Sequence, residues 1–238
     1  MTTLNLLYKK SIPITSDISI VVPTVGEILD NEDEHNDIIS SLTAMPIDMM
    51  VQLDDVGIDF SEINAYDLFI LMFRSLKNMD TKLVFGDLDL TKFDVVRDDK
   101  TRKFRVECKQ TGVVIDRAIH TTIASTIRKI YHLEQNRRRP ANQEAKEYMI
   151  HRAREKMARR KNRQEISRLE SLIIAMVNTE QFKYNYEQVR DLTIYQFNES
   201  VYQIIHKVDC EHKLNAVYAG TLSPSDLSQD ELNWLSHK

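Results

Sequence analysis

The sequence predicts a mainly helical α+β protein with a small antiparallel β meander, an N-terminal helical region and a C-terminal helical bundle. Three observations predict this fold class. Apolar residues recur at helical spacing along most of the 238 residues. Only five glycines are present, which disfavours folds that depend on tight turns. Segments of strand length and β-branched composition gather between residues 82 and 115.

The N-terminal region is predicted to begin with a strand and to continue as helices. Ile18–Val22 is rich in β-branched residues and reads as a short strand. Thr24 and Glu27 then form a capping-box pattern, which begins a helix. Apolar residues at helical spacing predict a second helix from Asp37, and Pro46 suits the first turn of a third.

A longer helix and then the meander are predicted next. Asn64 can cap a helix over residues 65–77 that is apolar around more than half of its circumference, as a central core helix would be. Turn-forming residues separate the strand-like segments that follow, so an antiparallel arrangement is expected. These segments are Lys82–Phe85, Phe93–Arg97, Phe104–Cys108 and Val113–Ile115.

Helical patterns return after Asp116 and continue almost to the end of the chain. An isoleucine stripe predicts a helix from Ile119 to about Tyr131. Pro140 breaks the chain, and Asn142 can cap a polar helix that runs to about Arg163. Further helices are predicted at Leu169–Val177, at Tyr184–Leu192, at Ile194–Val208 and after the capping box of Ser228 and Glu231.

Charge divides the chain into two parts. Residues 1–100 hold 19 acidic and 8 basic residues, whereas residues 128–168 hold 14 basic and 5 acidic residues. The length fits one large domain or two small ones. We predict two: an acidic N-terminal helical region with the β meander at residues 1–116, and a basic C-terminal helical bundle at residues 117–238.

The basic stretch between residues 137 and 168 is a candidate binding patch. Clustered Lys and Arg can neutralise the phosphates of a nucleic acid or attract an acidic protein surface, and they can also simply solvate a helix face. Tyr148 is the one aromatic residue in the stretch, so the stacking of bases has little support. The candidate residues are Arg137, Arg138, Arg139, Arg152, Lys156, Arg159, Arg160 and Arg163.

Methionines in the first helical region form a candidate apolar groove. Their unbranched, polarisable side chains adapt to varied apolar surfaces, and an apolar helix of a client protein would be the natural ligand. Ordinary core filling is the alternative interpretation. The residues are Met45, Met49, Met50 and Met72.

Two further clusters contain residue types that can bind metal ions. The acids between Asp30 and Asp37 lack the Gly-centred loop of a calcium site, and they either attract a basic segment or form a solubilising loop. His206, Cys210 and His212 lack the second ligand pair of a structural zinc site. We therefore predict no metal and no cofactor.

Nothing in the sequence indicates catalysis or membrane insertion. The nucleophile-elbow, Walker and zinc-protease motifs are all absent, so a non-enzymatic protein is predicted. Two cysteines, Cys108 and Cys210, suit a reducing compartment, and the longest apolar stretches are too short to span a bilayer. We expect a cytosolic protein without a membrane anchor.

Several runs of residues resemble a protein family from phages and prophages of Gram-positive bacteria. The runs are Val22–Ile28, Leu42–Met50, Leu53–Phe60, Phe85–Asp89 and Asp230–Trp234. In general type, the family is similar to phage tail assembly chaperones. These are small acidic helical proteins that accompany the tape-measure protein.

The resemblance implies a morphogenesis protein of the host bacterial cytoplasm or the virion, whose partner is the tape-measure protein or another tail protein. Self-association into a homo-oligomer is a further expectation. No functional residue carries over from it. The basic segment departs from a purely acidic chaperone, which leaves a nucleic-acid-binding phage protein or a structural virion component as alternatives.

Overall fold

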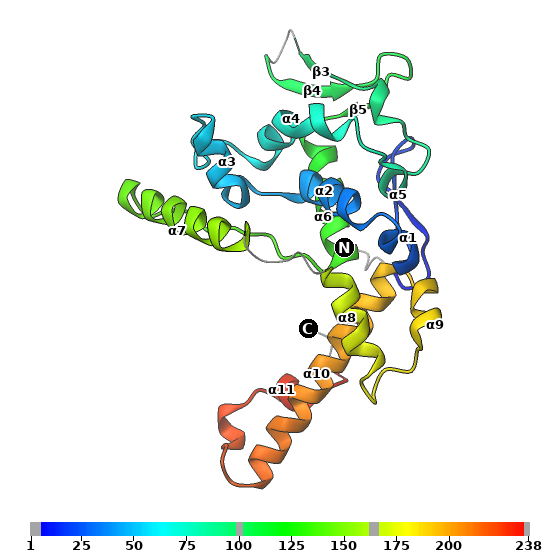
Figure 1. Cartoon of the computed structure of the whole chain (residues 1–238), viewed down its shortest axis with the longest axis vertical. Coiled ribbons are helices and arrows are strands. Elements are labelled where there is room, and N and C mark those ends of the chain that lie inside the picture. Colours follow the sequence, from blue (N-terminus) through cyan, green and yellow to red (C-terminus); the bar gives the residue numbers. More distant parts are fainter. Residues whose placement is uncertain (1–5, 99–101, 162–166, 236–238) are drawn as a thin grey trace.

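A computed structural model describes residues 6–98, 102–161 and 167–235 (Figure 1). It is mainly helical with two small antiparallel sheets, which confirms the predicted fold class. The first sheet pairs β1 (Ser11–Pro13) with β2 (Ser19–Val21), so that Ile12 lies opposite Ile20. Strand β2 confirms the predicted strand at residues 18–22. Strand β1 was not predicted, because three residues carry no alternating pattern.

Local capping signals predicted where the first helices begin. Thr24 and Glu27 form the expected capping box at the start of α1 (Val25–Leu29), with Glu27 accepting a 2.7 Å bond from the Thr24 amide. Asn64 caps α4 (Ala65–Leu76) by accepting bonds from the amides of Tyr66 and Asp67. Between them lie α2 (Glu32–Thr43), η1 (Pro46–Met49) and α3 (Met50–Asp55).

The segment Lys82–Phe85 forms the short helix α5, so the prediction of a strand there was wrong. The carbonyl of Thr81 accepts bonds from the amides of Val84 and Phe85, which closes a single helical turn. Gly86 ends the turn with a positive φ of 61°. Val84 and Phe85 are both buried, and a short apolar run of this kind fits a strand or a helical turn equally well.

The other predicted strands are present as a three-stranded meander. After η2 (Leu90–Lys92) come β3 (Asp94–Arg97), β4 (Phe104–Glu107) and β5 (Val114–Ile115), in the order β3-β4-β5 with antiparallel pairing. Val106 of the central strand lies opposite Val95 and Ile115. Its side chain is fully buried, which fixes one face of the sheet against α4.

Helices account for most of the remaining described chain. Asp116 caps α6 (Arg117–Tyr131), and Asn142 caps α7 (Gln143–Lys161) by accepting a 2.8 Å bond from the Ala145 amide. Helix α10 runs past its predicted end at Val208 to Tyr218, because no Gly or Pro interrupts it before Gly220. The others are α8 (Arg168–Val177), α9 (Tyr186–Asp191), η3 (Pro224–Asp226) and α11 (Gln229–Leu232).

One large core joins the first and last parts of the chain. It is built from α1, α2, α4, α5, α6, β2 and β4 together with α8, α9 and the start of α10. The backbones of Thr24 and Thr193 form an isolated β-bridge, with bonds of 2.8 Å from Val25 N to Leu192 O and 2.9 Å from Ile194 N to Pro23 O. The first turns of α1 and α10 are therefore held side by side.

Two helices extend away from this core (Figure 1). The second half of α10 forms an arm at the bottom of the view that carries α11, and α7 projects to the left, where it contacts α3. Helix α6 packs against α2, α4 and β2 of the acidic region and against α10 of the basic region. The division of the chain at residues 116 and 117 stays a prediction.

Candidate functional site: an apolar groove and the basic helix that covers it

A second, smaller core lies apart from the large one and joins α7 to the methionine-rich region. We call this the small core. Its buried side chains come from η1, α3, α4, the loop before α4 and α7, and they are Ile47, Leu53, Phe60, Leu68 and Ile150. Ile150 is the contribution of α7, with an exposed fraction of 9%. An apolar groove of the N-terminal region therefore already holds one helix of the same chain.

The predicted methionine residues surround this small core. Met45, Met49, Met50 and Met72 are all half-buried and pack against it, together with Met149 of α7. The structure thus brings the four residues of the candidate groove together. It also places them beside the basic helix, which sequence patterns did not predict.

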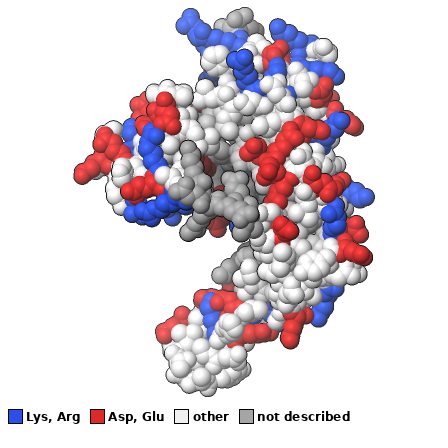
Figure 2. Space-filling model, in the orientation of Figure 1, with Lys and Arg blue, Asp and Glu red and all other residues white. Residues whose placement is uncertain are grey.

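Three ion pairs, made by two cations of α7, flank the apolar contact between α7 and α3. Lys146 Nζ lies 2.6 Å from Asp59 Oδ2, and this bond, with those from Ser61, lowers the pKa of Asp59 to about 2. Arg154 Nη2 lies 2.7 Å from Asp54 Oδ2 and 2.6 Å from Asp55 Oδ1. Figure 2 shows acidic and basic side chains intermixed on this lobe of the molecule. Acidic residues at the edge of the groove thus pair with Lys146 and Arg154 of α7, the helix that covers the groove.

The remaining described cations of α7 point the other way. Residues two apart on a helix are separated by roughly 200° around its axis, so Arg152 and Lys156 lie opposite Ile150 and Arg154. The guanidinium carbon of Arg152 lies 5.9 Å from the centre of the Tyr148 ring. The Arg159 side chain is 81% exposed, and its Nη2 lies 4.0 Å from Glu155 Oε2. Helix α7 therefore has one face on the groove and one cationic face toward solvent.

The other predicted basic residues lie at the two ends of α7. Arg137, Arg138 and Arg139 are exposed and belong to the irregular segment between α6 and α7. Arg160 belongs to α7, but its side chain lies outside what the structure describes. Arg163 lies outside the described residues altogether. Six of the eight predicted positions can therefore be placed, in two groups.

The acidic cluster between Asp30 and Asp37 binds other parts of the same chain. Helix α2 begins within it, so several of its carboxylates occupy a first helical turn, where negative charge is favourable. Asp30 pairs with Arg190 at 2.8 Å, and Glu32 accepts a 2.6 Å bond from Ser167. Its described contacts with the C-terminal part of the chain are thus made to α8 and α9.

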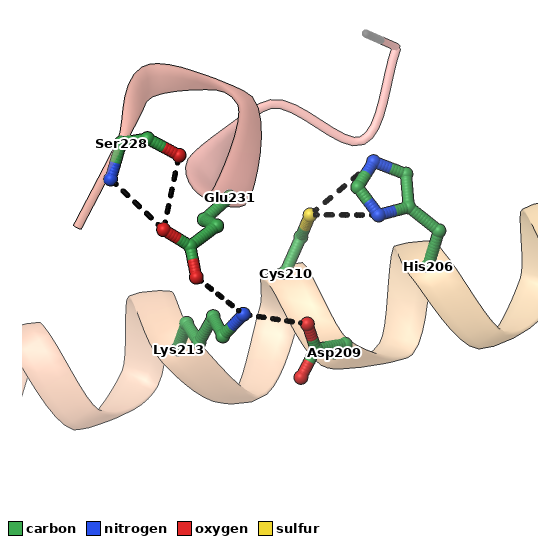
Figure 3. A network of polar contacts seen from close by, with 6 residues as sticks. All are labelled: His206, Asp209, Cys210, Lys213, Ser228 and Glu231. Atoms are coloured by element: carbon green, nitrogen blue, oxygen red, sulfur yellow. Dashed lines mark hydrogen bonds and ion pairs between the residues drawn. The ribbon is translucent and has the colours of Figure 1, made fainter. Parts of the chain in front are cut away.

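The residues His206 and Cys210 meet on α10, under the last helix (Figure 3). Cys210 Sγ lies 3.8 Å and 3.9 Å from the two ring nitrogens of His206, and the thiol is fully buried. Among the described residues, no three His, Cys, Asp or Glu side chains are grouped closely enough to hold a metal ion.

An ion-pair network beside these residues holds the tail on α10 (Figure 3). Lys213 Nζ bridges Asp209 at 2.8 Å and Glu231 at 3.1 Å. The backbone amide of Ser228, the Lys213 ammonium and the Ser228 hydroxyl all bind Glu231, and they lower its pKa to about 2. This network positions the capping box that was predicted at Ser228.

Two buried histidines were missed when candidate residues were chosen from the sequence. His35 shares a 2.8 Å hydrogen bond with the Tyr131 hydroxyl, and His120 stacks on Phe69 with ring centroids 4.3 Å apart. Burial lowers the pKa of each imidazole to about 4. A signal was present, because His35 lies at helical spacing with the buried Ile38 and would share its face.

Comparison with known proteins finds a similarity in the C-terminal part of the chain. Residues 160–238 match the family model of the YomV second domain, and this supports a phage or prophage protein family. The matched region includes α8 to α11. No curated protein and no solved structure matches the chain. In the described ranges, no helix combines the length and the apolar character needed to cross a membrane.

Proposed function

We propose, from the phage or prophage family to which the match points, that the chain is a morphogenesis protein that acts as a tail assembly chaperone. It binds an apolar helix of a tail protein in the groove of η1, α3 and α4. The tape-measure protein is the natural client. The observation that carries the proposal is the small core, where this groove takes up α7 through one buried side chain, Ile150.

The contact with α7 indicates what the groove accepts. The four half-buried methionines around it can adapt to different apolar side chains. Asp54, Asp55 and Asp59 stand beside it and select cations at positions that flank the apolar contact. A client helix with an apolar stripe between Lys or Arg residues would reproduce the contacts of α7.

Helix α7 is also suited to be displaced by such a client. Helix α7 is mostly polar, and Ile150 is its one buried residue among those described. Burial of one such side chain contributes only about 2 kcal/mol to the stability of the contact. Its ion pairs with Asp54 and Asp55 of α3 are partly exposed to solvent. Such pairs stabilise a contact by only about 0 to 1 kcal/mol each. A client with a longer apolar stripe would outcompete it.

Co-expression with the tape-measure protein of the same phage tests the proposal. Met72→Glu places a charge in the groove and should abolish co-purification. Leu71→Glu is the matched control, because Leu71 is the neighbouring residue on α4 and is 52% exposed. Ile150→Asp should release α7 and increase client capture. If no variant changes client solubility, or if both α4 variants behave alike, the chaperone function is wrong.

The cationic outer face of α7 favours a second candidate function, nucleic-acid binding. Arg152, Lys156 and Arg159 follow a spacing of four and three residues, so they form one stripe along an exposed helix. A stripe of this kind can follow a phosphate backbone, and such binding weakens steeply with salt.

A gel shift at low salt tests this candidate. The triple charge reversal Arg152→Glu, Lys156→Glu and Arg159→Glu should abolish the shift. The same reversal at three exposed lysines elsewhere is the control, and these are Lys9, Lys10 and Lys183. No shift with the native protein, or equal loss in both triple variants, would rule out a specific role for the stripe.

A further inference from the structure

A cavity lies at the base of α7, where Ile47 and Phe60 of the small core and the neighbouring Met45 form part of its lining. Its volume is about 390 Å³. One part of its lining is the irregular segment that contains Arg137, Arg138 and Arg139, and a second part is formed by η1 and the residues that lead into α4. We call this cavity the arginine pocket.

The arginine pocket carries an excess of positive charge. Three consecutive guanidinium groups line it, and no carboxylate does. Asp48, the nearby acid, is engaged by the side chain of Asn136 at 3.0 Å and by the amide of Met45 at 2.9 Å. Within the described part of the chain, no carboxylate forms an ion pair with these three arginines.

A fourth cation increases this excess. Arg128 of α6 is half-buried, and its guanidinium donates to the carbonyl of Thr43 beside the same segment. Burial is the largest cause of the lowered pKa of Arg128. Attraction to Asp48 opposes this shift, and repulsion by Arg137 adds to it. A bound anion would favour the charged form of these side chains.

The second part of the lining, which we call the apolar wall, is mainly apolar, with Ser61 and Asn64 as its polar members, and it limits which anions would fit. Ile47 and Phe60 of the small core line it with Met45 and Ile63, and Pro140 closes one end. A small inorganic anion would leave this apolar surface uncovered. A ligand that combines a phosphate with a flat organic group would cover both parts of the lining, and guanidinium groups bind phosphate in a bidentate manner. The volume lies within the usual range of small-molecule sites.

We infer that the arginine pocket binds a nucleotide-sized phosphate ester, with the phosphate on Arg137, Arg138 and Arg139 and the attached group against Phe60 and Ile63. Such a ligand exists as a free nucleotide or as the 5′-terminal nucleotide of a strand. The inference is independent of client binding in the groove, because it requires neither displacement of α7 nor a protein partner.

Isothermal titration of the full chain tests the inference with four probes: inorganic phosphate, AMP, a short 5′-phosphorylated oligonucleotide, and the same oligonucleotide without its 5′-phosphate. AMP should bind at least tenfold more tightly than inorganic phosphate, because it also covers the apolar wall. A stronger response to the phosphorylated oligonucleotide than to AMP identifies a strand end as the ligand, and the reverse identifies a free nucleotide.

Two variants separate this site from general charge. Arg137→Gln, Arg138→Gln and Arg139→Gln together should weaken AMP binding at least tenfold, whereas Lys9→Gln, Lys10→Gln and Lys183→Gln remove equal charge from exposed positions and should leave it unchanged. Ala65→Leu lines the pocket with a larger side chain at a helical position and should also weaken binding. Circular dichroism checks that each variant is folded.

Three results would overturn the inference. The first is no binding of any probe to the native protein. The second is equal weakening by the two triple variants, which would indicate general charge attraction. The third is equal affinity for the two oligonucleotides together with no binding of AMP, which would indicate contacts to the strand backbone.

Discussion

The guanidinium of Arg154 lies 2.7 Å from the carboxylate of Asp54 and joins residues that are 100 positions apart in the sequence. This ion pair lies at the edge of the contact between α7 and α3. Both partners are exposed to almost half of their surface, so the pair fixes the register of α7 more than it stabilises it. The stability of the joint comes from Ile150, which is buried beside it.

The first prediction is that Ile150→Asp releases α7 from the small core. The substitution removes about 2 kcal/mol of apolar burial and places a charge in an apolar site. Amide hydrogen exchange in α3 and α7 should accelerate, while the midpoint of global unfolding changes little because the large core is separate.

Arg152→Asp is the matched control for this prediction. It introduces the same side chain two residues away, on the opposite face of α7, and should leave exchange in α3 as it is in the native protein. Equal acceleration by both variants would show that α7 is not held by Ile150.

Sequence patterns predicted the elements of this fold better than their contacts. Capping boxes depend on residues three positions apart, and those at Thr24 and Ser228 are present as expected. The contact of α7 with α3 depends on residues about a hundred positions apart, such as Leu53 and Ile150. The period of a helix indicates which face is apolar, but it does not identify the partner of that face.

The candidate sites show the same limit. The four methionines and the basic residues were selected as separate sites because they are far apart in the sequence. The fold brings Met149 of α7 against the small core that Met45 and Met50 border. The arginine pocket was also missed as a cavity, because its apolar wall comes from residues 45–65 and its cations from residues 137–139.

The second prediction concerns Gly26, which lies where α1 meets α9. A Cβ atom added there would lie 3.1 Å from the carbonyl oxygen of Arg190 and 3.2 Å from its Cβ. Gly26→Leu should therefore separate the two helices and destabilise the protein by about 2 kcal/mol. Urea unfolding measures the loss.

Gln52→Leu, at an exposed position of α3, is the control for the added apolar side chain. It should change the free energy of unfolding by less than about 0.5 kcal/mol, as surface substitutions usually do. If Gly26→Leu is as stable as this control, the close approach of α1 and α9 does not exist in solution.

The third prediction is a loss of stability in mild acid, caused by His35 and His120. Burial lowers the pKa of each imidazole to about 4 in the folded protein, below the ordinary value of 6.5. The unfolded chain therefore binds more protons between these two values. The contribution of both residues is complete above pH 6.5 and decreases as the pH falls toward 4.

Urea unfolding at pH 7 and pH 5 measures this effect. The two residues together should lower the free energy of unfolding by up to about 4 kcal/mol at pH 5, since one pKa unit corresponds to about 1.4 kcal/mol. His120→Leu should remove about half of the difference, because it leaves only His35 to titrate. If the free energy of unfolding of this variant falls between pH 7 and pH 5 by as much as that of the native protein, other groups cause the acid sensitivity.

The fourth prediction is that the ion pairs of Lys213 hold the C-terminal tail on α10. Trp234 is the single tryptophan of the chain and reports on the tail directly. Lys207 lies over its ring at 5.5 Å, and Gln203 donates a 2.6 Å bond to its carbonyl. Lys213→Met removes both ion pairs of the bridge, to Asp209 and to Glu231, so the tail should detach and the Trp234 emission should shift to longer wavelength.

Acid should have the same effect on Trp234 through Glu231. The pKa of this carboxyl is lowered to about 2 from 4.5, so its contribution is complete above pH 4.5 and is lost as the pH falls toward 2.

Glu211→Gln is the control, because Glu211 pairs with Lys207 at 3.7 Å and makes no ion pair to α11 within the described residues. Its emission spectrum should match that of the native protein. A red shift in this control as large as that in Lys213→Met would mean that any charge change on α10 disturbs Trp234, and the specific bridge through Lys213 would be excluded.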